Sequence, residues 1–383
     1  MSNLSSDSQK PSRRLNDDLV VMARCLATIG PNINEIARRT GQYKETVRYR
    51  YHKFFLDKGL TIQAMPNYSK LGFKRIILIA KLAPASDAHA TSIFSAMSDM
   101  CYLHSFTRVL LSGTFVIHVA VPSQLAERCA ALYGALQEAG LFTELEILAF
   151  DEIRNAPMKP EYFDFGNQTW SFDWSAAKAK PIHLVPSPRP EVEKYDKTDL
   201  IILKEFDKDA SRPLVKMVEK VKVNLKALEF HYQNHVQGRG LIKGYRLIWQ
   251  GSHYDSNLEK TVSRKDVYIE LTILLSECSP SEKTELMSLL NKTPFLWSEA
   301  YSSAYCAEVF LPNHAYNDFL EYIGEFANRL GDRLRILVMD QTQALRFVMA
   351  YNLFDNETKT WRLDEGNVLK ALANLPLAKL SSS

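Results

Sequence analysis

The chain has 383 residues and a formal net charge of +3, with 46% hydrophobic and 24% charged residues. These values are typical of globular proteins, and the length favours two to four domains. No apolar run approaches the ~18 residues needed to cross a bilayer, and the polar start lacks the apolar core of a signal peptide. The sequence therefore predicts a cytoplasmic protein without membrane contact, and residues 1–14 are expected to form a disordered arm.

The cysteines are few and scattered, and none forms a C-x-x-C pair. Such a distribution argues against a disulfide framework and against a clustered zinc site. Free thiols in a reducing cytoplasm are therefore expected. The residues are Cys25, Cys101, Cys129, Cys278 and Cys306.

Positive charge is concentrated in two segments. Residues 1–62 hold 11 Lys/Arg and 6 Asp/Glu, and residues 194–250 hold 12 and 7, so each segment carries +5. The remainder of the chain must then carry −7 to reach the total of +3. Local positive charge attracts a phosphate backbone whatever the global charge.

The two basic segments share an apolar pattern at an offset of 181 residues. In the first copy we expect helices at 17–28, capped by Asn16, at 33–40, capped by Asn32, and at 43–58. A short helix, a tight turn and a longer helix make a helix-turn-helix, and the extended residues that follow suit a wing. The sequence thus predicts winged helix-turn-helix domains at 15–68 and 195–252.

Each helical unit is followed by a second repeated pattern of strands and helices. The order is β-α-β-β-α-β, which is the ferredoxin-like arrangement. We expect such modules at 69–150 and 263–345. The elements are 73–82, 88–98, 102–111, 114–121, 123–139 and 141–150 in the first copy, and 267–275, 281–290, 295–304, 305–311, 313–330 and 333–339 in the second.

Two further segments are interpreted as connections. Residues 151–194 are rich in proline and aromatic side chains, which predicts a linker partly packed on a domain. Residues 346–383 are interpreted as a C-terminal tail with one helix near 366–375.

The combined pattern resembles the leucine-responsive/asparagine-synthesis regulator family (Lrp/AsnC), here as a tandem fusion of two copies. The resemblance rests on DKTDLIILKEFDKDA at 196–210 and GRGLIKGYRLI at 238–248, and on ETVRYR at 45–50 and KGLTIQAMPNYSKLGF at 58–73. It implies an α+β chain in which two winged helix-turn-helix domains alternate with two sensor modules that pair as an internal pseudo-dimer. It further implies a transcription regulator that binds double-stranded DNA, with a small amino-acid-like effector, no cofactor and no enzymatic activity.

The expected DNA contacts lie mainly on the third helix of the first unit, because a recognition helix enters the major groove. Arginine can contact guanine there, and lysine or tyrosine can hold phosphate. The equivalent face of the second unit is less basic. The predicted residues are Tyr43, Lys44, Thr46, Arg48, Tyr49, Arg50, His52 and Lys53, with Lys222, Asn224 and Lys226 in the second unit.

Two other functions remain open at this point. Siroheme decarboxylases resemble the same two-module build and use His and Arg near a tetrapyrrole, roles that His104 and Arg108 could fill. A scaffold that binds other proteins is the third possibility. His231 and His235 are four residues apart on a helix, but no third ligand is visible in the sequence, so no metal site is expected.

Overall fold

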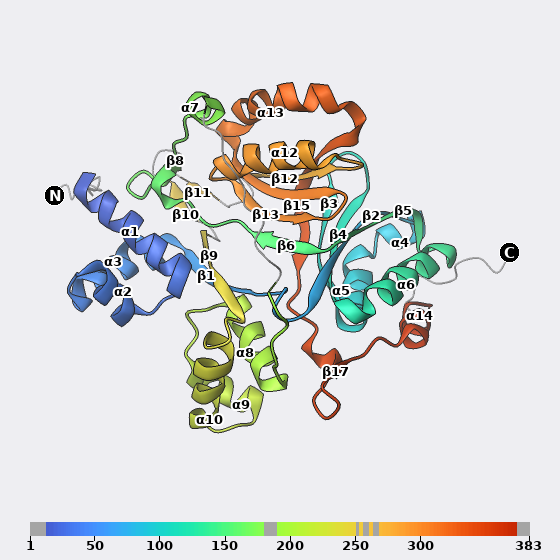
Figure 1. Ribbon diagram of the computed structural model, residues 1–383, viewed down its shortest axis with the longest axis horizontal. Coiled ribbons are helices and arrows are strands. Elements are labelled where there is room, and N and C mark those ends of the chain that lie inside the picture. The colour runs from blue at the N-terminus through green and yellow to red at the C-terminus, as the bar shows by residue number, and fades with distance from the viewer. Residues whose placement is uncertain (1–12, 180–189, 250–252, 256–259, 263–267, 374–383) are drawn as a thin grey trace, which may run out of the picture.

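The computed structural model describes residues 13–179, 190–249, 253–255, 260–262 and 268–373. The segment interpreted as a disordered arm lies outside this range except for its last two residues. Among the described helices, none is both long and apolar enough to cross a membrane. The fold is mixed α+β, with helical units around a large antiparallel sheet (Figure 1).

The first helical unit contains α1 (Arg13–Ile29), α2 (Ile33–Thr40) and α3 (Lys44–Phe54). Asn32 caps α2 as predicted, because its side chain accepts a hydrogen bond from the Glu35 backbone N–H. The predicted cap at Asn16 is wrong, because α1 already begins at Arg13, three residues before Asn16. The Asn16 side chain accepts a hydrogen bond from the Phe165 backbone N–H instead.

The second helical unit is less regular than the first. It contains α8 (Lys197–Lys208), α9 (Val218–Val221) and α10 (Leu225–Phe230). The third helix then continues as a π-helical stretch, η5 (His231–Gln237). Asp196 caps α8 in a reciprocal capping box with Asp199, which fixes where the helix starts.

The strands that follow the two units pair with each other. Strand β1 (Leu60–Pro66) runs antiparallel to β9 (Ile242–Trp249), from Leu60 opposite Trp249 to Pro66 opposite Ile242. A wing was expected on each unit separately. Instead the two segments form one ribbon, which joins the helical units at the left and bottom of Figure 1.

Both modules have the predicted β-α-β-β-α-β order. The first contains β2 (Phe73–Leu82), α4 (Pro84–Asp87), α5 (Ala90–Met100), β3 (Leu103–Val109), β4 (Phe115–Pro122), α6 (Ala126–Glu138) and β5 (Phe142–Phe150). The second contains β12 (Tyr268–Leu275), α12 (Pro280–Lys292), β13 (Leu296–Tyr301), β14 (Tyr305–Pro312), α13 (Tyr316–Leu330) and β15 (Leu334–Arg346). The insertion before the second module forms a small hairpin of β10 (His253–Asp255) and β11 (Lys260–Val262).

The two modules share one antiparallel sheet. Among the described residues its order is β5-β2-β4-β3-β15-β12-β14-β13-β6, where β6 (Glu152–Asn155) follows β5 almost directly in the chain. The sheet therefore closes on itself, since one segment supplies both outer strands. Strand β15 also crosses from one half to the other. Its residues Leu334–Met339 pair with β12 of the second half, and Ala344–Arg346 pair with β3 of the first half.

Closure brings the inner faces of the two halves together, while their helices cover the outer faces. Alternate residues of β2 show this: Ile76, Leu78 and Ala80 belong to the core under the helices of the first half, whereas Ile77 packs in the shared interior. Apolar side chains from both halves fill that interior. They are Ile77, Val109, Val116 and Phe150 from the first half, and Leu274, Ala300, Cys306 and Met339 from the second.

The segments interpreted as linker and tail contain a third repeated element. A short hairpin of β7 (Phe163–Asp164) and β8 (Thr169–Trp170) precedes α7 (Trp174–Ala179), and a hairpin of β16 (Phe354–Asp355) and β17 (Thr360–Trp361) precedes α14 (Glu365–Ala373). We call these two segments, residues 163–179 and 354–373, the arms; the N-terminal residues 1–14 are not one of them.

Each arm packs on the opposite half. Trp170 contacts Phe295 of the second module at 5.7 Å, and its indole N–H donates to Tyr268 at 3.0 Å. Trp361 contacts Phe73 of the first module at 5.1 Å and donates to Tyr195 at 3.0 Å. The exchange follows from the sheet, because β6 and the end of β15 have already carried the chain across.

Loss of the second arm's anchor should destabilise the whole molecule. Trp361→Ala removes a buried indole, and truncations of this kind cost about 3–5 kcal/mol in the free energy of unfolding. Urea denaturation followed by circular dichroism measures the effect. Tyr43→Ala, at an 87% exposed position, is the control and should change it by less than about 0.5 kcal/mol. Equal midpoints for the two variants would show that the arm does not hold the halves together.

Candidate functional site

A polar cavity of about 460 Å³ lies where the two halves meet the ribbon of β1 and β9. We call it the central cavity. The ribbon supplies Gln63, Met65, Arg246 and Ile248, and the end of α8 supplies Asp207 and Lys208. The rest of the wall comes from the sheet and the turns beside it, including Tyr68, Arg75, His104, Glu270, Trp297, Glu308, Phe310 and Arg346.

A buried chain of hydrogen bonds joins the halves behind this wall. The Arg75 guanidinium lies 3.2 Å from Nδ1 of His118, and Nε2 of His118 lies 3.3 Å from the Glu308 carboxylate. Arginine has no acceptor, so Nδ1 must accept. The His118 proton is then on Nε2, where it donates to Glu308. The Ser298 hydroxyl donates to the other oxygen of that carboxylate.

The charges in this chain follow from its burial. Burial lowers the pKa of His118 to about 4, with Arg75 acting in the same direction and Glu308 against it. Burial also works against the Glu308 carboxylate, but His118, Arg75 and the Ser298 hydroxyl outweigh it and lower its pKa to about 2. At neutral pH the neutral His118 imidazole therefore links the Arg75 cation to the Glu308 anion through hydrogen bonds.

Three buried polar atoms on the cavity wall have no hydrogen-bond partner among the described residues: the Tyr68 hydroxyl, Nε of Arg75 and Nδ1 of His104. Buried polar groups are otherwise almost always paired, so such atoms mark a place where a polar ligand can bind. His104 sits at an irregularity of β3, between Leu103 opposite Val119 and Ser105 opposite His118. Bulges of this kind redirect a side chain and are common next to active sites.

The electrostatics of this trio are set by burial and by nearby arginines. Burial raises the pKa of Tyr68 to about 12, so its hydroxyl carries a proton at neutral pH. Burial and the charge of Arg346 hold the pKa of His104 well below its usual value, so this imidazole is neutral. The trio therefore offers one permanent cation, one hydroxyl donor and one neutral imidazole.

Two further arginines stand nearer the opening. Arg346 pairs with the buried Asp207 at 2.7 Å, and its side chain is 36% exposed. Arg246 lies over the Trp297 ring at 3.9 Å and donates to Asn155 at 2.8 Å. Burial, and then the charge of Arg346, lower the pKa of Arg246 to about 9, which still leaves it cationic at neutral pH. An anionic ligand would thus meet several cations.

One side of the cavity is apolar. A smaller cavity of about 100 Å³ adjoins it and shares Met65, Arg246, Ile248, Trp297 and Phe310 with it. Aromatic and aliphatic walls beside convergent cations suit a large, flat ligand with carboxylates at its edge.

Of the two residues considered for tetrapyrrole chemistry, the structure brings one to the cavity. His104 lies on its wall. Arg108 is engaged elsewhere, because it pairs with Asp87 at 2.9 Å and lies over the Phe115 ring at 5.3 Å.

No family model matches the chain, and no curated protein matches it significantly. Among solved structures, it is similar to the siroheme decarboxylase NirDL in complex with an iron-uroporphyrin III analogue. The two are 9% identical, the match covers 93% of this chain and 99% of that chain, and the TM-score is 0.50. A second structure of NirDL gives 10% identity, 94% and 99% coverage and a TM-score of 0.49. At such identities the likeness concerns the fold alone.

The predicted Lrp/AsnC-like DNA-binding regulator is wrong. A solved structure that matches almost the whole chain, with a TM-score of 0.50, is that of an enzyme in complex with a tetrapyrrole analogue. Double-stranded DNA as the partner and the prediction that the chain is not an enzyme are overturned with it. The two basic segments, residues 1–62 and 194–250 (the basic islands), and the helical units led to the wrong interpretation, because the same architecture serves both kinds of protein.

The residues predicted to contact DNA do not gather at the central cavity. Most are exposed on α3, but Arg50 is turned toward α1 and pairs with Asp18 at 2.9 Å. Asn224 caps α10 by accepting from the Ala227 backbone N–H at 2.9 Å. The others lie at solvent-facing or half-buried positions: Tyr43, Lys44, Thr46, Arg48, Tyr49, His52, Lys53, Lys222 and Lys226.

The sequence did carry a signal for the cavity that we missed. Arg75 and Glu308 are charged residues inside otherwise apolar strands, FKRIILIAKL and YCAEVFLP. A charge in such a run is buried unless the strand is at an edge, and a buried charge needs a partner. Tyr68, Asp207 and Arg346 lie in a turn, near a helix end and at a strand end, where polar residues are ordinary, and Arg246 lies within β9, where a lysine also occurs.

The His118 chain predicts a pH dependence of stability. The folded pKa is near 4 and the unfolded value near 6.5, so the unfolded state binds more protons between these values. The free energy of unfolding should therefore fall as pH drops from about 6.5 to about 4, by on the order of 3 kcal/mol for this group. Urea denaturation at several pH values measures the slope. His118→Gln, whose amide can accept from Arg75 and donate to Glu308, should flatten it; an unchanged slope in this variant would contradict the assignment. The exposed His52→Gln is the control.

Proposed function

We propose that this chain is an enzyme that decarboxylates a carboxylate-bearing iron tetrapyrrole of the siroheme or uroporphyrin type. The observation that carries the proposal is the central cavity, where three arginines and a neutral histidine face aromatic walls. The whole-chain likeness in fold to a siroheme decarboxylase supports the same function.

The ligand chemistry matches the walls. A tetrapyrrole has two flat apolar faces and a rim of acetate and propionate carboxylates. Trp297, Phe310 and Met65 offer surfaces for the faces, and Arg246 and Arg346 offer donors for carboxylates at the rim. Arginine holds carboxylates in a fixed geometry through paired N–H groups. Such contacts would orient the ring with one acetate directed inward.

The reaction requires a proton at the inner end of the cavity. Loss of CO₂ from an acetate breaks the bond between the carboxyl carbon and the methylene carbon and leaves its electron pair on the latter. A proton must then bind there, so that the acetate becomes a methyl group.

Tyr68 is our candidate for the proton donor. Its hydroxyl is buried and protonated, and it has no hydrogen-bond partner in the part of the chain that the structure describes. Arg346, Arg75 and Arg246 favour its anion electrostatically, against burial and the Asp207 carboxylate, which together raise its pKa. His104, whose ring lies 5.9 Å from the Tyr68 ring, would bind or position the acetate together with Arg75.

The helical units have a structural part in this proposal. We interpret them as winged helix-turn-helix folds whose paired wings, β1 and β9, close one side of the cavity and exclude water. The free cysteines fit a reducing compartment, and we place the enzyme in the cytoplasm.

Tyr68→Phe should separate binding from chemistry. The variant keeps the ring but lacks the proton, so turnover should fall by about 10²–10⁴-fold, the usual contribution of general acid catalysis. Binding of iron uroporphyrin or siroheme, followed by the change in its visible absorbance, should be little altered. Product is detected by mass spectrometry as the loss of CO₂ from the tetrapyrrole.

The arginines supply the contrast. Arg346→Gln should weaken tetrapyrrole binding, whereas Arg108→Gln, outside the cavity, should leave binding and turnover unchanged. Absence of tetrapyrrole binding by the unmodified chain would refute the proposed function. Full turnover by Tyr68→Phe would refute only the assigned proton donor.

A further inference from the structure

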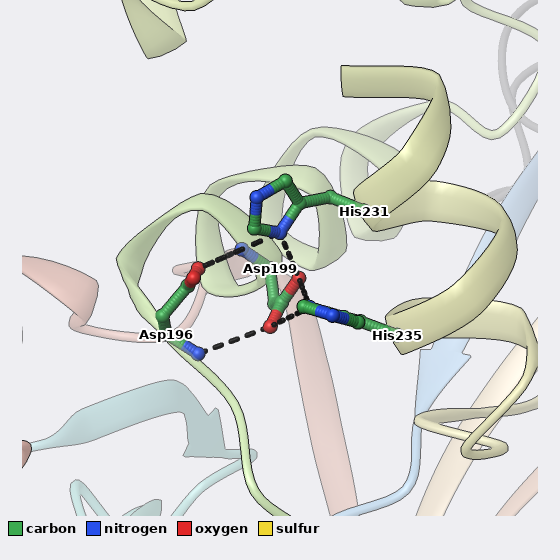
Figure 2. Close-up of side chains that lie close together, drawn as sticks. All are labelled: Asp196, Asp199, His231 and His235. Carbon is green, nitrogen blue, oxygen red and sulfur yellow. Dashed lines mark hydrogen bonds and ion pairs between the residues drawn. The ribbon is translucent and has the colours of Figure 1, made fainter. Parts of the chain in front are cut away.

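In the second helical unit, α8 and η5 bring four metal-ligating side chains together. Asp196 and Asp199 come from the start of α8, and His231 and His235 come from η5 (Figure 2). One ligand atom from each lies within 4.8 Å of the others. We call this group the Asp–His cluster.

The two imidazoles converge on one buried carboxylate. Nδ1 of His231 is 2.9 Å from Oδ1 of Asp199, and Nδ1 of His235 is 3.2 Å from both of its oxygens. The Asp199 side chain is fully buried, while those of His231 and His235 are 18% and 19% exposed. Asp196 lies at the rim, 3.8 Å from Nδ1 of His231. The cluster is therefore closed to solvent at Asp199 and open to solvent at Asp196.

In the first copy of the repeat, the aspartate that corresponds to Asp199 has a different partner. At the offset of 181, Asp199 corresponds to Asp18 and His231 to Arg50, and these two form an ion pair of 2.9 Å. A permanent cation there neutralises the carboxylate. The second copy has no such cation at this position. It has two imidazoles instead, and it replaces Leu15 and Phe54 of the first copy with Asp196 and His235.

The backbone supports the convergence. Residues His231–Gln237 form a π-helix rather than an α-helix. This wider winding is rare and is frequently found at functional sites. Here it accompanies two histidines whose rings lie 4.7 Å apart.

We propose that the Asp–His cluster binds a divalent transition-metal ion of the zinc type. Two carboxylates and two neutral imidazoles neutralise a 2+ ion. Tetrahedral coordination at about 2.0–2.1 Å implies ligand–ligand separations of about 3.3 Å, which the observed contacts approach. Two nitrogen ligands favour zinc, cobalt or nickel over magnesium or calcium. On binding, the ion takes the place of the proton on Nδ1 of each imidazole, and each ring stays neutral because that proton is then carried on Nε2.

The ion would fix the position of α8. Asp199 lies near the start of this helix, and Asp207 and Lys208, at its other end, line the central cavity. A rise of 1.5 Å per residue places these ends about 12 Å apart. The metal is therefore structural and stands outside the cavity, so its presence does not depend on the proposed enzymatic function.

Metal binding to the full-length chain tests the site. After treatment with a chelator, we expect the protein to bind one equivalent of Co²⁺ at this site, with the visible absorbance of nitrogen and oxygen ligation and no thiolate charge-transfer band. Zn²⁺ should displace it and raise the melting temperature in a concentration-dependent way. Loss of a residue that hydrogen-bonds a metal ligand already weakens metal affinity by about 10–100-fold. The His231→Gln/His235→Gln double variant should therefore bind at least about 100-fold more weakly.

Two further variants make the outcome decisive. His52→Gln, an exposed histidine in the first unit, should bind Co²⁺ like the unmodified chain. If the double variant does not fold, Asp196→Asn replaces it, because asparagine also caps helices and should weaken binding without unfolding α8. The proposal is overturned if the unmodified chain shows no such Co²⁺ absorbance, or if the cluster variants bind as well as His52→Gln. The cluster would then only hold α8 and η5 together through hydrogen bonds.

Discussion

The central cavity depends on a hydrogen-bonded pair, the neutral His118 imidazole and the Glu308 carboxylate, that a symmetric molecule could not form. Phe73 opposes Pro122 in the first half, and Tyr268 opposes Pro312 in the second, so the two registers correspond. By that correspondence His118 matches Glu308, and the two meet between the halves. In a dimer of identical chains, equivalent residues meet at the dyad and would both be His or both be Glu. Two halves of different sequence in one chain are free of this restriction. Arg75 likewise corresponds to Glu270, so one half became basic and the other acidic where they face each other.

Continuous chain crossing holds these unlike halves in register. Strand β5 belongs to the first half and β6, one residue later, to the second, while β15 crosses in the opposite direction. Each crossing is extended by an arm whose hairpin places a tryptophan on the far side, Trp170 half-buried and Trp361 buried. The interface is therefore built from strand ladders and aromatic packing as well as from the apolar interior. Such an interface can carry a buried Arg–His–Glu chain, whose desolvation cost demands fixed partners.

Periodicity revealed the repeat, the three-helix units and both β-α-β-β-α-β modules, because each is a local pattern of apolar spacing. It did not reveal the arms, since Phe163 to Trp170 and Phe354 to Trp361 are hairpins too short for a periodic signal. The cavity was missed for a different reason. Its residues come from six or more separate elements, and only closure of the sheet brings Tyr68, Arg75 and Arg346 together. His104 was singled out, but without the register nothing distinguished it from Arg108, which points to another partner.

The basic islands show why charge counts misled the functional interpretation. In the second island, Arg212 and Lys220 both pair with the buried Glu205, at 2.5 and 2.9 Å, and Arg246 faces the cavity. In the first, Arg38 and Arg39 share Glu35, at 2.6 and 2.8 Å. Several cations of both islands are thus paired with acidic residues of the same island, and the net charge of +5 already includes these pairs. A field that attracts DNA requires cations that face solvent together, whereas here part of the cationic surface turns inward. The helical units then act through their strands: by pairing with each other, β1 and β9 cover the cavity and present Gln63, Met65 and Arg246 to whatever binds within it.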